Sequence, residues 1–125
     1  VDTSLTCGVK IFMGASTGNM LVDNTATLEG IFAATSLLVA THCESTPMIL
    51  EAEAAATAKW GEDIPFSEHP NIRSVEACYA SSSLAVGLAR KHGTKLHQLK
   101  ASALLLKPAC ITCSLTPMTT LTKAR

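Results

Sequence analysis

The alternation of short apolar runs with longer segments of helical periodicity is the feature that most constrains the fold of this chain. Residues 7–13, 37–40 and 94–99 have the length and composition of strands, and apolar residues at helical spacing fill the segments between them. Strands that alternate with helices pair in parallel, because a parallel connection is long enough to contain a helix. The sequence therefore predicts an α/β fold with a parallel sheet and right-handed crossovers.

Capping and breaking residues set the expected ends of the helices. Helices are expected over residues 25–35, 48–60 and 72–92. Asn24 or Thr25 caps the first helix. Thr46, followed by Pro47, caps the second helix and Gly61 ends it, while Gly93 ends the third. The predicted order is therefore strand, helix, strand, two helices, strand.

The composition bounds the class of protein. The chain has 125 residues, enough for one domain, and its 47% hydrophobic and 16% charged content excludes a disordered chain and a highly charged coiled coil. No apolar run reaches the roughly 18 residues of a membrane-spanning helix, so no membrane partner is expected. The five cysteines are an odd number, which favours free thiols in a reducing compartment. A cytoplasmic protein is expected.

Charge is unevenly distributed, although the net charge is zero. All ten acidic residues lie within residues 1–76, whereas residues 77–125 hold seven of the ten Lys and Arg residues. Such an asymmetry can mark a nucleic-acid-binding half. The basic residues are scattered, however, and Tyr79 is the one aromatic residue among them, so a stacking surface for bases is missing. No nucleic-acid partner is expected.

A lysine within the first apolar run is unusual for its surroundings. Lys10 is flanked by Val9 and Ile11. A lysine near the end of such a strand is expected to point into a crowded apolar place, where it must find a partner, lose its proton or be chemically converted. His42 follows the second apolar run, so Lys10 and His42 are predicted at the ends of successive strands, in the arrangement of a metal site. The alternative for His42 is a hydrogen-bonded core histidine.

The later part of the chain offers further candidates. His97 and Lys100 lie around the end of the third predicted strand. Arg73 and Glu76 are three residues apart, which is the spacing of an ion pair on one helix, either buried or at the surface.

Three stretches of the sequence resemble a known enzyme family. They are GVKIFMGASTGNMLVDN from Gly8, LLVATHCES from Leu37, and GEDIP from Gly61 followed by HPNIRSVEACYASSSLAVGLARKHGTKLH from His69. In this order they are similar to the dihydroorotases of the amidohydrolase superfamily, most closely to the bacterial single-function enzymes. The resemblance runs over residues 1–99 and implies part of a (β/α)8 TIM barrel, about strands four to six with their helices. Residues 100–125 form a divergent tail.

The resemblance also implies a function and a site. The family interconverts dihydroorotate and N-carbamoyl-L-aspartate in pyrimidine biosynthesis, as a metal-dependent cyclic amide hydrolase with two Zn²⁺ ions. Lys10 matches the lysine that carbon dioxide converts into a carbamate between the metals, and His42 matches an imidazole ligand. Ser16, Thr17 and Asn19 belong to a loop expected on the substrate side.

The chain departs from the family pattern in three places. The paired histidines of the family's first strand and the aspartate of its last strand are absent, so we expect no catalytic residue in this chain and no activity from it alone. Lys100 stands where the family has a second metal-binding histidine. The pattern ends abruptly after Gln98, which favours the hypothesis that the tail is out of frame.

Two alternatives stay open beside dihydroorotase. One is another amidohydrolase, such as dihydropyrimidinase or allantoinase, and the other is a non-catalytic dihydroorotase-like scaffold protein. Homo-oligomerisation of the full-length relative stays open as well.

Overall fold

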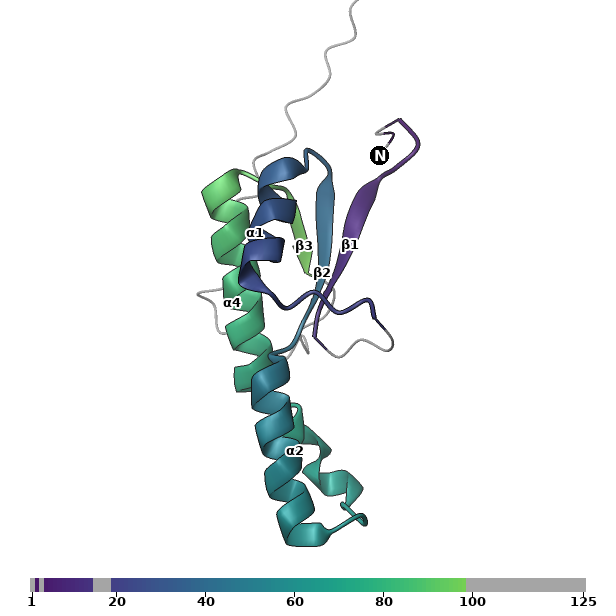
Figure 1. Cartoon of the computed structure of the whole chain (residues 1–125), viewed down its shortest axis with the longest axis vertical. Helices are drawn as coiled ribbons and strands as arrows, with labels where there is room; N and C mark the ends of the chain where they lie inside the picture. The colour runs from purple at the N-terminus through teal and green to yellow at the C-terminus, as the bar shows by residue number, and fades with distance from the viewer. Residues whose placement is uncertain (1, 3, 15–18, 99–125) are drawn as a thin grey trace, which may run out of the picture.

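A three-stranded parallel sheet with helices on one side organises the chain (Figure 1). The structure is a computed structural model, and it describes residue 2, residues 4–14 and residues 19–98. In chain order the elements are β1 (Gly8–Met13), α1 (Thr25–Ala34), β2 (Leu38–Cys43), α2 (Thr46–Trp60), the 3₁₀ turn η1 (Phe66–Glu68), α3 (His69–Ile72), α4 (Val75–His92) and β3 (Leu96–Gln98). The predicted parallel α/β order is confirmed. The predicted tail, residues 100–125, lies outside the described residues.

The strands lie in the order β1, β2, β3, which is the arrangement expected of neighbouring strands in a βα barrel. Both pairs are parallel, and the register sets Lys10 opposite Ala40 and Phe12 opposite His42. His97 of β3 lies opposite the other side of Ala40. The sheet is thus consistent with part of a TIM barrel, while its assignment to strands four to six remains a prediction.

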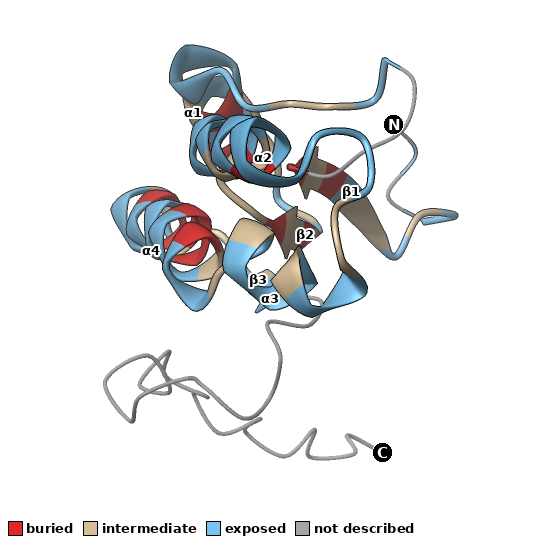
Figure 2. Cartoon of the chain, turned by 90° about the horizontal axis from the view of Figure 1, so that it is seen from below, coloured by how far each residue is buried: buried red, intermediate tan, exposed pale blue. Residues whose placement is uncertain are grey.

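The core fills the space between one face of the sheet and helices α1 and α4 (Figure 2). Strand side chains alternate between the two faces of a sheet, so every second residue of β1 and β2 points toward these helices. The buried residues that meet there include Ile11, Met13, Val39, Leu28, Phe32, Ala85 and Leu88. This apolar layer holds the strands in register.

Three helix ends match their predicted signals. The Asn24 side chain accepts a hydrogen bond from the Thr27 amide at 3.0 Å, which satisfies a donor at the start of α1. Gly93 ends α4 in the left-handed conformation, with φ of 67°. The C-cap of α2 is Gly61, also at a positive φ.

Other boundaries differ from prediction. The N-cap position of α2 is Ser45, and Thr46 is its first helical residue. The long helix begins at Val75 because Arg73 and Ser74 leave the helical region, and the Ser74 side chain then caps α4 by accepting from the Ala77 amide. Strand β2 continues through His42 to Cys43, beyond the predicted end at Ala40, since β1 offers it partners along that length.

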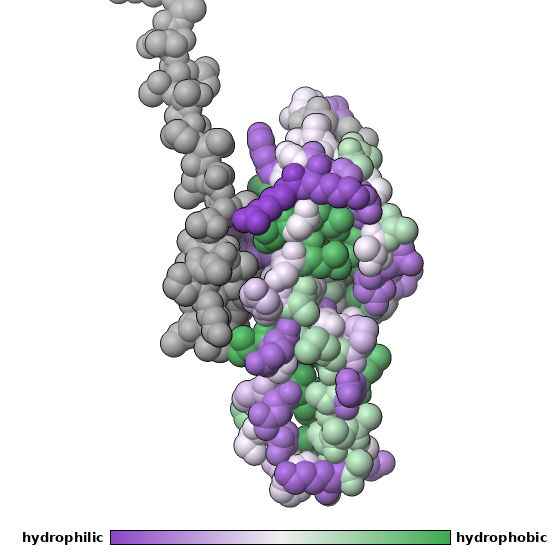
Figure 3. All heavy atoms as spheres, turned by 90° about the vertical axis from the view of Figure 1, so that its left-hand side faces the viewer, coloured by the Kyte–Doolittle hydropathy of each residue, from purple (hydrophilic) through white to green (hydrophobic). Residues whose placement is uncertain are grey.

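Helix α2, η1 and α3 extend beyond the end of the sheet as a second, smaller layer (Figure 1). The side of the molecule seen in Figure 3 interleaves hydrophilic and apolar side chains. Among the described residues, no helix combines the length and apolarity needed to cross a bilayer. The described cysteines, Cys7, Cys43 and Cys78, are free thiols, as predicted.

Candidate functional site

The sheet has a second face, opposite the core, that carries the candidate site residues Lys10, His42 and His97. We call it the open face, and it consists of Gly8, Lys10, Phe12, Leu38, Ala40, His42 and His97, which alternate with the core residues of their strands. These residues are exposed or half-buried, in contrast to Ile11, Val39 and Thr41 on the other face. In a closed barrel, residues of this parity would line the interior.

Lys10 and His42 are diagonal neighbours on this open face. Lys10 pairs with Ala40, and His42 lies two residues further along β2. Strand spacing and rise place their Cα atoms roughly 8 Å apart. His97 lies across Ala40 from Lys10, so the three basic side chains share one surface.

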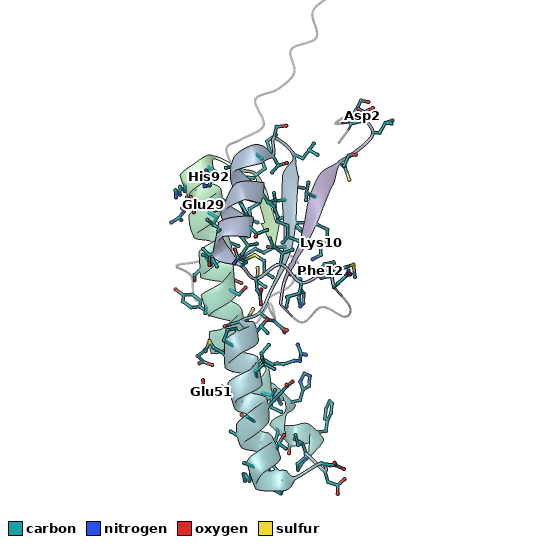
Figure 4. The ribbon with its side chains drawn as sticks, viewed as in Figure 1. Asp2, Lys10, Phe12, Glu29, Glu51 and His92 are labelled. Carbon is teal, nitrogen blue, oxygen red and sulfur yellow. The ribbon has the colours of Figure 1, made fainter. Side chains whose placement is uncertain are left out.

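The predicted burial of Lys10 is wrong. Lys10 is exposed, and it is the third residue of β1 rather than the last, three residues before Met13. The reason is that its face of the sheet lacks a covering layer within the described residues. Its Nζ atom lies 4.6 Å from the centre of the Phe12 ring, in cation–π contact (Figure 4).

Partial desolvation lowers the pKa of Lys10 from its ordinary value, with a smaller opposing effect from Cys43. Burial disfavours the ammonium form, whereas a neighbouring thiolate favours it. The shift moves Lys10 toward the neutral amine. This is the form that can react with carbon dioxide or donate a lone pair to a metal.

We therefore expect Lys10 to titrate below the roughly 10.4 of a free lysine. The measurement is an NMR pH titration of the lysine side chain, with Lys10→Arg to assign the signal and the urea-unfolded chain as the reference. Since the folded state binds this proton less tightly than the unfolded state, the contribution of Lys10 to stability rises with pH between the folded and unfolded pKa values. A midpoint equal to or above that in urea would contradict the prediction.

His42 lies close to the carboxyl end of β2, as predicted, but it is not a core histidine. Its side chain is 34% exposed, and its Nε2 atom lies 3.9 Å from Oε2 of Glu44. The alternative of a buried, hydrogen-bonded imidazole is therefore wrong. A negatively charged carboxylate next to Nε2 favours the neutral tautomer that carries its proton on that nitrogen.

Glu44 is also paired with Arg73. Nη1 of Arg73 donates a hydrogen bond to the same carboxylate oxygen that faces His42. The expected pairing of Arg73 with Glu76 is thus replaced by a contact between residues 29 positions apart in the sequence. The residue after Glu44 is tied to the first turn of α4, because the Ser45 amide donates a hydrogen bond to the Ala77 carbonyl at 3.0 Å.

Gly14 lets the ends of β1 and β2 approach this closely. A Cβ atom at Gly14 would lie 2.1 Å from the carbonyl oxygen of Glu44, and φ is +153° there. At that separation, position 14 excludes every residue that has a Cβ atom. Glu44, Arg73 and Gly14 were not predicted as site residues, and the signal that could have found the first two is their place in the stretches LLVATHCES and HPNIRSVEACY.

A cavity of about 290 Å³ lies on the core side of the same strand ends. Its lining includes Met13, Leu28, Glu44, Thr46 and Leu84. The Thr46 hydroxyl is buried without a hydrogen-bond partner in the described structure. Glu44 thus stands between this cavity and the open face.

The remaining predicted site residues are only partly described. Asn19 is exposed in a turn that follows β1. Nearby, the Val22 amide donates to the Phe12 carbonyl at 2.8 Å, which brings the returning chain back to the edge of β1. Ser16, Thr17 and Lys100 lie outside the described residues.

The described residues do not form a metal site by themselves. Within them, no group of three or more His, Cys, Asp or Glu side chains could hold a metal ion. Lys10 and His42 are two nitrogen donors on one surface, and the lowered pKa of Lys10 suits a donor that must lose its proton. These two donors would fit one side of a metal centre but are too few to complete it.

The sequence matches no protein-family model and no curated protein. Among solved structures, the fold is similar to L-hydantoinase (dihydropyrimidinase) from Arthrobacter aurescens, with a TM-score of 0.67 and 22% sequence identity. The match covers 74% of this chain and 21% of the hydantoinase chain, so this chain spans about a fifth of that protein. The likeness shows that the chain has the fold of a part of that structure.

Proposed function

We propose that this chain supplies one part of the active-site sheet of a metal-dependent cyclic amide hydrolase. The observation that carries the proposal is the shared open face of β1 and β2, where Lys10 in the middle of β1 and His42 near the carboxyl end of β2 are diagonal neighbours. In βα barrels, catalytic groups gather at the carboxyl ends of the strands. The similarity to a hydantoinase, whose name denotes a cyclic amide hydrolase, supports the same class of reaction.

In this proposal Lys10, as a carbamate, and His42 hold one side of a centre of two zinc ions. Such ions supply Lewis-acid activation of the scissile carbonyl and of water. The chain's own contribution is to place the two ligands on paired strands and to lower the pKa of Lys10, which favours its neutral amine. A neutral amine is the nucleophile for carbon dioxide: its nitrogen bonds to the carbon, a proton is released to solvent, and the carbamate carries one negative charge shared by two oxygens.

Two substrate classes follow from the two similarities. The stretch GVKIFMGASTGNMLVDN favours dihydroorotate, whereas the structural neighbour favours a dihydropyrimidine or hydantoin. They differ in chemistry, because dihydroorotate carries a carboxylate and calls for a cationic group near the ring. We propose dihydroorotate, with dihydropyrimidines as the second candidate.

The test combines ligation and turnover. We expect ¹³C-bicarbonate and Zn²⁺ together to give a carbamate signal that is lost in Lys10→Arg, and to shift the imidazole signals of His42. His42→Ala should remove the effect of Zn²⁺ on the carbamate. His69→Ala is the matched control, since His69 is an exposed histidine on α3. If Zn²⁺ leaves both Lys10 and His42 unchanged, the proposal is wrong.

The isolated chain is expected to show no measurable hydrolysis of dihydroorotate, dihydrouracil or hydantoin. The reason is that it spans about a fifth of the neighbouring enzyme and offers two metal donors in its described part. The assay uses excess Zn²⁺ and bicarbonate. Turnover that disappears in Lys10→Ala would contradict the expectation that the site needs further ligands.

A further inference from the structure

The Arg73–Glu44 ion pair lies next to His42, at the carboxyl end of β2. Oε2 of Glu44 accepts a hydrogen bond from Nη1 of Arg73, and the same oxygen lies 3.9 Å from Nε2 of His42. The Glu44 side chain is 19% exposed, while those of Arg73 and His42 are each 34% exposed. One carboxylate oxygen therefore faces two cationic or proton-bearing groups at once.

From this geometry we propose that Arg73 and Glu44 are positioning residues for His42, and that they set the orientation and tautomer of its imidazole. A carboxylate beside Nε2 favours the tautomer that carries its proton there, which leaves the lone pair on the other ring nitrogen. Carboxylates that orient histidines in this way are common behind functional imidazoles. The inference rests on the proposed function in that His42 is there a ligand.

The backbone around Glu44 is held by contacts with neighbouring segments, so the carboxylate keeps its position beside His42. Gly14 packs directly against the Glu44 carbonyl, and the Ser45 amide is bonded to Ala77 in the first turn of α4. Arg73 is fixed as well, because its amide donates to the His69 carbonyl at 2.9 Å and Ser74 starts α4. Both partners of the ion pair thus sit on backbone that is tied at neighbouring residues.

An ion pair of this exposure contributes little to stability, so its removal should leave the fold intact. A change at His42 in a variant that still folds therefore indicates a positioning role and not a structural one. In Arg73→Ala, Glu44 loses the partner that holds it toward His42. In Glu44→Gln, the shape is kept and the charge is removed.

The experiment is long-range ¹H–¹⁵N NMR of the ¹⁵N-histidine-labelled chain without metal, which reports the tautomer ratio of His42, together with relaxation of its ring C–H groups. We expect the ratio of the two tautomers to fall several-fold in Arg73→Ala and in Glu44→Gln, and ring mobility to rise. Arg73→Lys should restore part of the ratio because it keeps a cation. Lys59→Ala is the matched control, since it breaks a comparable ion pair with Glu68 at 3.8 Å, away from His42.

An unchanged tautomer ratio and ring mobility in Arg73→Ala and Glu44→Gln would overturn the inference, as would an equal change in Lys59→Ala. Backbone amide spectra of β1 and β2 confirm that each variant is folded. If Arg73→Ala fails to fold, Glu44→Gln and Arg73→Lys test the inference instead: the tautomer ratio should fall in Glu44→Gln and fall less in Arg73→Lys. Because the readout needs no metal, a change at His42 together with no response to Zn²⁺ would sustain the positioning role while the proposed function fails.

Discussion

Gly14→Ala is expected to destabilise the chain by about 3 kcal/mol or more, and to disorder the link between β1 and β2. Two costs combine at this position. The added methyl group would lie 2.1 Å from the Glu44 carbonyl oxygen, and the backbone has a φ of +153° that side chains rarely adopt. The obstructing atom belongs to the backbone, so it cannot rotate away as a flexible side chain would.

Urea unfolding followed by far-UV circular dichroism measures the effect, and Gly30→Ala is the matched control. Gly30 lies in α1, and an added Cβ there meets nothing within 4 Å. Because alanine is favoured over glycine within a helix, that variant should be more stable than the parent by about 0.5–1 kcal/mol. Equal stabilities for Gly14→Ala and the parent would show that the strand ends are further apart than described.

The Gly14 substitution also has a consequence for the site. A shift of the Glu44 backbone would move the carboxylate that lies between Arg73 and His42. We therefore expect the His42 signals in the NMR experiment to change in Gly14→Ala and to stay unchanged in Gly30→Ala.

Phe32→Ala is the second substitution with a large expected effect, a loss of about 3–5 kcal/mol of unfolding free energy. Phe32 is 1% exposed and has the largest fully buried side chain in the part of the chain that the structure describes. It lies in the cluster that joins α1 to Ile11, Met13 and Val39 of the sheet. A loss of this size is a large fraction of the stability of a small domain.

Chemical or thermal denaturation measures this loss, with Phe66→Ala as the control of identical chemistry. Phe66 is 89% exposed and stacks on His69 at the surface, so its removal should change stability by no more than about 0.5 kcal/mol. Phe32→Leu keeps most of the volume and gives an intermediate value if Phe32→Ala does not fold. A similar small cost at both phenylalanines would contradict the described core.

Much of the fold follows from short-range patterns. Asn24, Ser74 and Gly93 act at helix ends through bonds that span three or four residues, and such signals are visible in the sequence. Ser74 was nevertheless missed, because the apolar periodicity continues across it and concealed the break between α3 and α4. The strand ends were misplaced for a related reason, since pairing with β1 extends β2 through polar residues.

The candidate site was predicted only in part. Lys10 and His42 were found from their place in apolar strands, and their common face follows from strand alternation once the register is known. The exposure of Lys10 was not foreseen, because burial depends on what covers a face and not on the neighbours of a residue in the chain. The contact between Glu44 and Arg73 was not foreseen either, since many other acidic residues had the charge to pair with Arg73.

The sequence by itself determined the kinds of element, their order and the parallel sense of the sheet, because propensity, capping and connection length act locally. It also marked a lysine and a histidine as candidates for one site. Only the tertiary structure decided that Lys10 is exposed beside Phe12, that Gly14 packs on the Glu44 backbone, and that Glu44 lies between Arg73 and His42. These features depend on strand register and on the start of α4, which bring together residues far apart in the chain.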